Sequence, residues 1–155
     1  MALRPDRVIE MSDALHTMGA VASKGVVLCF NASASGVALG DSHGTLQLGA
    51  SASGLKPAGV LLTDVVNIDE TRYHTNYFKE EVNIGDPVEI LTRGWVITDK
   101  VTGSPSEGNK AYLTANGVVT PTSLGAAATP LVGEFGGSID ELGFVKLKIN
   151  LPNGA

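Results

Sequence analysis

The histidines of this sequence are the residues whose type could bind a metal ion. His16, His43 and His74 lie far apart in the chain, and none shows the short i, i+4 type of spacing that places two imidazoles on one metal ion. Asp41 lies close to His43 in a glycine-flanked stretch, but one carboxylate and one imidazole do not make a coordination sphere. We therefore predict no metal site and no cofactor.

Nucleophilic catalysis also lacks a motif. A serine hydrolase needs a serine on a sharp turn, as in Gly-x-Ser-x-Gly, with a histidine and an acid in reach, and the sequence contains no such motif. Cys29 is the single cysteine, and its apolar neighbours predict a buried small hydrophobe instead of a reactive thiol. The neighbouring acids Glu80 and Glu81 would point to opposite faces of a strand, so they cannot share a site. The sequence predicts no catalytic residues and a protein that is not an enzyme.

The composition indicates one folded, acidic domain. The chain has 155 residues, of which 43% are hydrophobic and 17% are charged, so it can bury enough apolar surface to offset the loss of conformational entropy. Its net charge of −5 gives no attraction to a polyanion, and we predict no nucleic-acid partner. No stretch approaches the length of about 18 apolar residues that a membrane span needs. The N-terminus also lacks the apolar core of a signal peptide, so we expect no membrane partner and a product that stays in the cytosol.

Short strands are favoured over long helices. The sequence holds 19 glycines and 7 prolines, and 5% of its residues are aromatic, which is typical of strands joined by tight turns. We predict a mainly β fold, a compact antiparallel β-barrel or sandwich of the SH3-like or β-tulip-like kind with long small-residue loops. Residues 1–24 form an N-terminal arm in this prediction, extended or with one helical turn from Ser12. Residues 25–155 form a single β-rich domain.

Hydrophobic patterns predict the individual strands. Residues 26–30 and 57–63 are apolar runs that indicate buried strands, and residues 45–48 alternate like a half-buried strand. Residues 131–135 are the next predicted strand. Residues 145–151 alternate cleanly, which sends Lys146, Lys148 and Asn150 to a solvated face. Residues 69–83 are rich in charge, and we expect them to be exposed.

An internal repeat, or echo, predicts two hairpins. Residues 85–98 and 108–120 align without a gap, 23 positions apart. Each unit places a glycine, Gly94 or Gly117, where a tight hairpin needs a residue with positive φ. Asn116-Gly117 is the stronger of the two turn signals. Trp95 would begin the returning strand of the first unit, where its size makes it a candidate anchor for the core or for a subunit interface. Strand edges left open in such a fold favour oligomerisation or strand addition.

The order and spacing of several segments resemble those of the capsid decoration proteins, or cement proteins, of tailed bacteriophages. The segments are residues 57–67, 85–90, 94–98, 108–113, 131–135 and 145–151. The resemblance covers roughly residues 57–151 and is carried by order and spacing, since these proteins have no catalytic signature.

The resemblance implies a small β-barrel-like protein, often a homotrimer, that binds the outer surface of the major capsid protein shell and stabilises it. It also implies a place on the outer surface of the virion, after synthesis in the cytoplasm of the host bacterium. The N-terminal arm would order on the shell, with Arg4 and Arg7 pairing with shell carboxylates and Val8, Ile9 and Met11 buried against it. Trp95 is the candidate residue for an interface between copies.

Two other classes of function stay open. A carbohydrate- or host-receptor-binding module on the virion would also be β-rich and non-catalytic. Such modules usually expose several aromatic side chains, however, and this chain has eight aromatic residues in total. A small enzyme whose site is assembled from distant residues is disfavoured because the sequence has no cluster of His, Cys and carboxylate residues.

Overall fold

The computed structural model describes residues 3–4, 6–31, 44–49, 54–63, 66–68, 78–123, 125 and 130–151. Some sequence-predicted features lie outside these residues: Asp41, His43, His74, half of the small-residue loop expected at 121–130 and most of the charged stretch 69–83.

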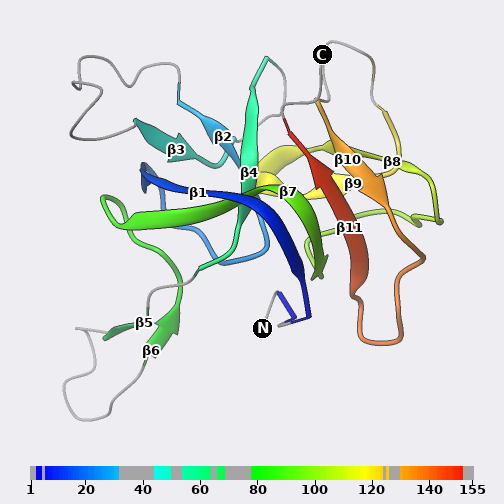
Figure 1. Cartoon of the computed structure of the whole chain (residues 1–155), viewed down its shortest axis with the longest axis horizontal. Helices are drawn as coiled ribbons and strands as arrows, with labels where there is room; N and C mark the ends of the chain where they lie inside the picture. Colours follow the sequence, from blue (N-terminus) through cyan, green and yellow to red (C-terminus); the bar gives the residue numbers. More distant parts are fainter. Residues whose placement is uncertain are drawn as a thin grey trace.

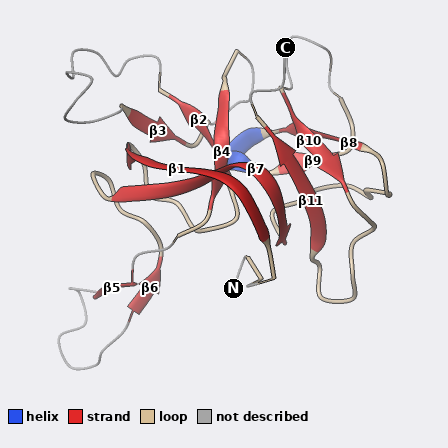
Figure 2. Ribbon diagram, in the orientation of Figure 1, coloured by secondary structure: helices blue, strands red, loops and turns tan. Residues whose placement is uncertain are grey.

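Strands account for nearly all of the regular structure in the described part of the chain (Figure 2), so the predicted mainly β fold is confirmed. The strands are β1 Val8–Met18, β2 Val27–Phe30, β3 Thr45–Gln47, β4 Pro57–Leu61, β5 Val66–Ile68, β6 Phe78–Glu80, β7 Pro87–Thr98, β8 Lys110–Leu113, β9 Val119–Thr120, β10 Leu131–Phe135 and β11 Val145–Asn150. One short 3-10 helix, η1 (Ala115–Gly117), lies between β8 and β9.

Nine of the strands in the described residues form one sheet that closes partly on itself. Its order is β1-β3-β2-β4-β7-β11-β10-β8-β9, and β1 pairs with β7 as well. That additional pairing completes a ring of β1, β3, β2, β4 and β7. In Figure 1, β2 and β3 lie on one side of β4, and β8 to β11 lie on the other. The sheet is mixed because β1 and β3 run parallel. β5 and β6 form a separate two-stranded sheet.

Two hydrophobic clusters share the strands β2, β4 and β7. Leu28, Leu61 and Ile90 belong to one cluster, and their chain neighbours Cys29, Val60 and Leu91 belong to the other. Successive side chains of a strand point to opposite faces, so these three strands form a wall with a core on each face. This explains why residues 26–30 and 57–63 are apolar runs without alternation.

The closing strand β11 has only one core-facing side, as its sequence predicts. Val145, Leu147 and Ile149 are buried, while Lys148 and Asn150 are exposed and Lys146 is half-buried. The strand therefore offers a polar outer face next to β7 and β10.

The N-terminal segment lies in the sheet and does not form the predicted arm. Val8–Met18 is strand β1, antiparallel to β7, and no helical turn begins at Ser12. Outside β1, Leu3 bridges to Thr98 and Ala22 bridges to Val82. Only His16 and Met18 are buried within the strand, so the segment lacks the core-facing alternation from which a strand is predicted.

The internal echo corresponds to one hairpin and not to two. In the second unit, β8 and β9 are joined through η1, where Asn116 has φ 58° and Gly117 has φ 74°, as predicted. In the first unit, β7 runs unbroken through Gly94. Gly94 has φ 139°, and a Cβ at this position would collide with the carbonyl oxygen of Val8. This glycine therefore permits the close approach of β1 and makes no turn, and Trp95 lies in the middle of a strand.

Candidate functional site

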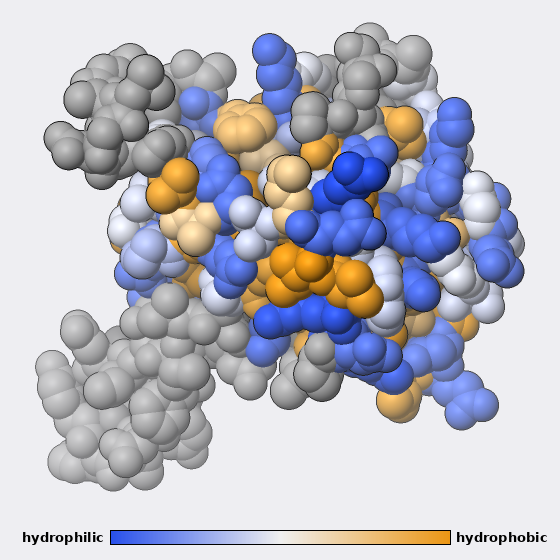
Figure 3. Space-filling model, in the orientation of Figure 1, coloured by the Kyte–Doolittle hydropathy of each residue, from blue (hydrophilic) through white to orange (hydrophobic). Residues whose placement is uncertain are grey.

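Strand β1 carries four large apolar side chains that face solvent. Val8 and Ile9 are each 42% exposed, Met11 is 57% exposed and Leu15 is 58% exposed. Every residue of the strand before His16 is exposed, apart from the half-buried Asp13. We call the four apolar residues the β1 stripe. In Figure 3 apolar surface gathers in the middle of the view, where Figure 1 shows β1. Val8 and Met11 lie opposite Trp95 and Arg93, whereas Ile9 lies opposite Gly94 and points to the other side of the strand. Exposed apolar side chains gathered on one element are typical of sites that bind another macromolecule.

The edge of β1 is irregular. Its ladder with β7 contains three register shifts, and among the described residues β3 pairs with β1 only at Thr17 and Met18. Bulges twist a strand and make its edge a poor template for a further strand. The stripe is therefore suited to contacts through side chains more than to strand addition.

Arg4 is already engaged within the molecule. Its Nη2 donates to Oδ2 of Asp140 at 2.8 Å, and its guanidinium lies 4.5 Å from the centroid of the Phe144 ring. Oδ1 of Asp140 accepts the backbone N–H groups of Leu142 and Phe144. The Phe144 N–H, helped by the Leu142 N–H and the charge of Arg4, holds the pKa of the Asp140 carboxyl below its ordinary value of 3.8 despite some desolvation. Arg4, predicted to pair with a partner, thus has a partner of its own in the isolated chain.

Arg7 is exposed and lies next to the stripe. Its Nη1 is 3.4 Å from the carbonyl oxygen of Leu62, a long hydrogen bond that an incoming acceptor can replace. Of the two predicted basic residues, Arg7 is the one available to a partner that covers β1.

Trp95 lies beside the stripe. It is opposite Val8 in the β1–β7 ladder and opposite Lys148 in the β7–β11 ladder. The Nζ of Lys146 is 4.0 Å from the centroid of the indole ring, so an ammonium group covers part of the aromatic surface that a sugar would need. Trp95, predicted for an interface between copies, thus lies next to Val8, which is predicted for shell contact, whereas Arg4 lies at the β10–β11 turn.

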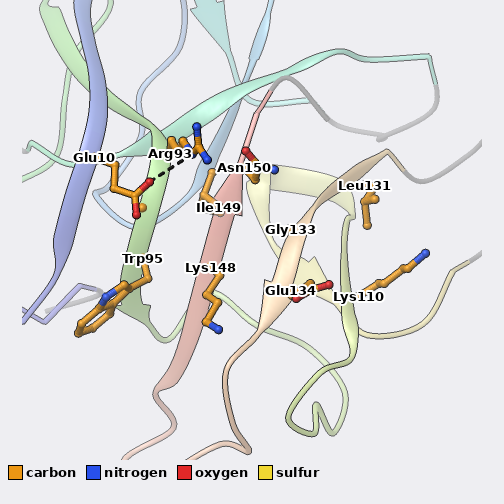
Figure 4. A pocket seen from close by; sticks show the side chains of 11 residues that line it. Glu10, Arg93, Trp95, Lys110, Leu131, Gly133, Glu134, Lys148, Ile149 and Asn150 are labelled. Atoms are coloured by element: carbon orange, nitrogen blue, oxygen red, sulfur yellow. Dashed lines mark ion pairs between the residues drawn. The ribbon is translucent and has the colours of Figure 1, made fainter. Parts of the chain in front are cut away.

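A hollow of about 490 Å³ continues from this surface across β7, β11, β10 and β8 (Figure 4). Backbone at Gly94, Ile149 and Gly133 forms its floor, and these residues are opposite one another in the ladders. Ile149 turns its side chain into the core, and the two glycines have none. The absence of outward side chains in this row gives the hollow its depth, and its volume lies in the range of about 300–1,000 Å³ that is usual for binding sites.

Charged side chains border the hollow on both sides. One border is a row of residues that are opposite one another on four strands and that Figure 4 shows in the same order: Trp95, Lys148, Glu134 and Lys110. The other border includes Asn150 and Arg93, whose Nε is 3.2 Å from Oε2 of Glu10. Leu131 completes the lining. We call this site the cationic hollow.

The hollow has a sign of charge opposite to that of the whole protein. Since Glu10 is paired with Arg93, Lys110 and Lys148 face one unpaired acid among the described residues that line the hollow, Glu134. Lys146 lies two residues from Lys148 on the same strand. The complete chain carries a net charge of −5. An acidic group that approaches this protein is therefore attracted here and repelled by the molecule as a whole.

The described residues hold no cluster placed to bind a metal ion, and the cysteine among them is buried. No cluster of three or more His, Cys, Asp or Glu residues placed to hold a metal ion occurs among the described residues. Cys29 is 1% exposed, as predicted, and burial raises the pKa of its thiol to about 11, which keeps the thiol protonated at neutral pH. Of the described residues, no helical segment has the length and apolarity to cross a bilayer.

Two features of the surface are absent from the sequence-based prediction. Leu15 belongs to the β1 stripe but was predicted only as part of an arm, although apolar residues without a buried alternation are a signal for an exposed stripe. The cationic hollow collects residues from five strands, and no local pattern places them together.

The comparisons with family models and with curated proteins give no match: no protein-family model matches the chain, and no curated protein has a similar sequence.

Proposed function

We propose that this protein is a structural capsid decoration protein of a tailed bacteriophage, which binds the outer surface of the major capsid protein shell and stabilises it. The β1 stripe would be buried against the shell, with Arg7 beside it. The protein would then reside on the outer surface of the virion. The resemblance in segment order leads to this class of protein, and the stripe is the observation that carries the proposal.

The stripe supports a binding role because it is costly to leave in water. Full burial of a side chain the size of Val, Ile, Leu or Met gains about 1.5–3 kcal/mol, and all four stripe residues are between 42% and 58% exposed. A large partner surface that covers β1 recovers this free energy. A protein that binds the assembled shell and not its dissociated subunits stabilises the shell by mass action.

The test is binding to assembled, undecorated shells of the source phage. We expect the wild type to co-sediment with these shells and to raise the temperature at which they dissociate. Leu15→Glu should bind at least about tenfold more weakly, because a charge replaces apolar contact area. Met11→Glu is a second variant in the same stripe and should behave in the same way.

Leu142→Glu is the matched control. Leu142 is 73% exposed, lies in the turn between β10 and β11 and receives the same substitution, so its binding should equal that of the wild type. A wild type that does not bind shells contradicts the proposal, as does equal loss of binding by Leu15→Glu and Leu142→Glu.

The homotrimer implied by the resemblance is part of the proposal. Sedimentation equilibrium should give a particle of three times the chain mass of 16.0 kDa. A particle of 16.0 kDa in solution, together with single copies on the shell, would exclude the trimer.

A further inference from the structure

We propose that the cationic hollow receives carboxylate side chains of the shell protein, so that charge sets the orientation in which the β1 stripe docks. This inference rests on the proposed function and names the chemistry of the partner surface: an apolar strip that covers β1, flanked on the β7–β11 side by acidic side chains.

The hollow and the stripe form one continuous surface. Glu10 of β1 lines the hollow, lies between the stripe residues Ile9 and Met11 in sequence, and is ion-paired with Arg93 of β7. Trp95 lines the hollow and is opposite the stripe residue Val8. A partner that covers the stripe therefore reaches the border of the hollow without a gap between the two contacts.

The groups that border the hollow suit a carboxylate. Lys148 and Lys110 are exposed, and the side-chain ammonium group of neither makes an ion pair or a hydrogen bond with another described residue. Asn150 and the guanidinium of Arg93 add N–H donors on the opposite border. Charge-assisted hydrogen bonds from such donors to a carboxylate are stronger than neutral ones. Two acidic groups oppose it: Glu134, which lies between the two lysines in the cross-strand row, and Glu10, which is paired with Arg93.

Charge orients the molecule because the rest of the chain has the opposite sign. An acidic shell surface repels a protein of net charge −5 except where cations gather, so the favourable approach has the hollow toward the shell. Complementary charge mainly raises the association rate and excludes wrong orientations, whereas apolar contacts supply most of the affinity. The stripe and the hollow thus have different, measurable roles.

Charge reversals at Lys148 and at its neighbour in the row, Glu134, test the inference. The measurement is binding to undecorated shells. Lys148→Glu should weaken binding at least about tenfold, mainly through the association rate. Glu134→Lys should strengthen binding, because it removes an opposing carboxylate. Both side chains are exposed, so neither change disturbs the core. Lys56→Glu changes the net charge as Lys148→Glu does, at an exposed lysine before β4 that does not line the hollow, and should bind like the wild type.

Salt gives an independent readout. Wild-type association should slow as the ionic strength rises, because screening shortens the range of the attraction to about 3 Å at 1 M. Lys148→Glu should lose most of this dependence. Equal effects of Lys148→Glu and Lys56→Glu would show a general effect of net charge and overturn the inference, and so would a Glu134→Lys variant that binds more weakly than the wild type.

The outcomes separate this inference from the proposed function. Loss of binding by Leu15→Glu with unchanged binding by Lys148→Glu overturns the role of the hollow and leaves the decoration role intact. A wild type that fails to bind shells overturns both. If Lys148→Glu instead lowers the sedimentation mass of the free protein, the hollow binds a second copy of this chain and the inference is overturned.

Discussion

Asp140 uses its two carboxylate oxygens for different partners. Oδ1 accepts the N–H groups of Leu142 and Phe144, while Oδ2 accepts Nη2 of Arg4. An asparagine keeps one oxygen for the turn and loses the negative charge. Asp140→Asn therefore isolates the link between the N-terminal segment and the β10–β11 turn.

We expect Asp140→Asn to be less stable than the wild type at pH 7, by a small margin because the ion pair is exposed. The folded-state pKa of Asp140 is lowered, so its contribution is present above the ordinary carboxyl pKa and is lost as the pH falls through the lower folded-state value. Urea unfolding at pH 7 and at about pH 2 measures the difference between the two proteins. A difference that is equal at both pH values would contradict the assignment.

Residue-level prediction from the sequence succeeded where the neighbours in the chain determine the environment. The apolar residues around Cys29 predicted its burial. The engagement of Arg4 was not predictable, because its partner Asp140 lies 136 positions away. Trp95 was predicted to begin a strand, and its position opposite Val8 depends on the pairing of β1, which the sequence does not show.

At the level of elements, Gly94 decides whether β1 can lie on β7. We expect Gly94→Ala to lower the free energy of unfolding by at least about 2 kcal/mol, because φ 139° is strained for alanine and the new Cβ meets the carbonyl oxygen of Val8. Gly137→Ala is the control, since a Cβ there has no heavy atom within 4 Å, and its stability should change by less than about 0.5 kcal/mol.

Urea unfolding of the two glycine variants measures these values, and amide exchange localises the effect. Exchange should accelerate first in β1 of Gly94→Ala. Equal stability of the two variants would mean that β1 and β7 can separate at Gly94 without cost.

Element prediction followed the core. Strands β2, β4 and β11 were predicted because their side chains contact a core and leave a clear pattern of apolar residues. The β8–β9 hairpin was predicted because Asn116-Gly117 encodes its own turn. Strand β1 was not predicted, since its exposed residues carry no periodic signal, and the echo at Gly94 was misleading because a glycine serves a turn and a close contact equally well.

At the scale of the whole molecule, the shared wall of β2, β4 and β7 couples the two clusters. Leu46 belongs to one cluster and Leu147 to the other, and both are 0% exposed. We expect Leu46→Ala and Leu147→Ala each to cost about 2–5 kcal/mol and to shift one common unfolding transition. Both clusters pack against β2, β4 and β7, so loss of packing in one cluster also removes support from the other.

Trp95 fluorescence and far-UV circular dichroism measure this coupling. The tryptophan lies on β7, and circular dichroism reports on all strands, so the two urea transitions should coincide in both variants. Two separate transitions in Leu46→Ala would show that the clusters unfold independently.

For the whole molecule, the sequence predicted the fold class but not the pairing of the strands. The mainly β fold followed from composition and strand patterns, but the ring through β1 and the cationic hollow depend on which strands pair, and pairing partners are distant in sequence. Binding to assembled shells tests the function proposed from segment order and spacing.

The three register shifts between β1 and β7 have a consequence for storage and expression. A straight, evenly spaced strand edge beside exposed Val, Ile, Met and Leu side chains is the usual start of a fibril. The irregular edge of β1 does not allow a strand of a neighbouring molecule to pair along it. Concentrated solutions of this protein should therefore stay free of thioflavin-positive aggregates even though the apolar side chains of β1 are exposed.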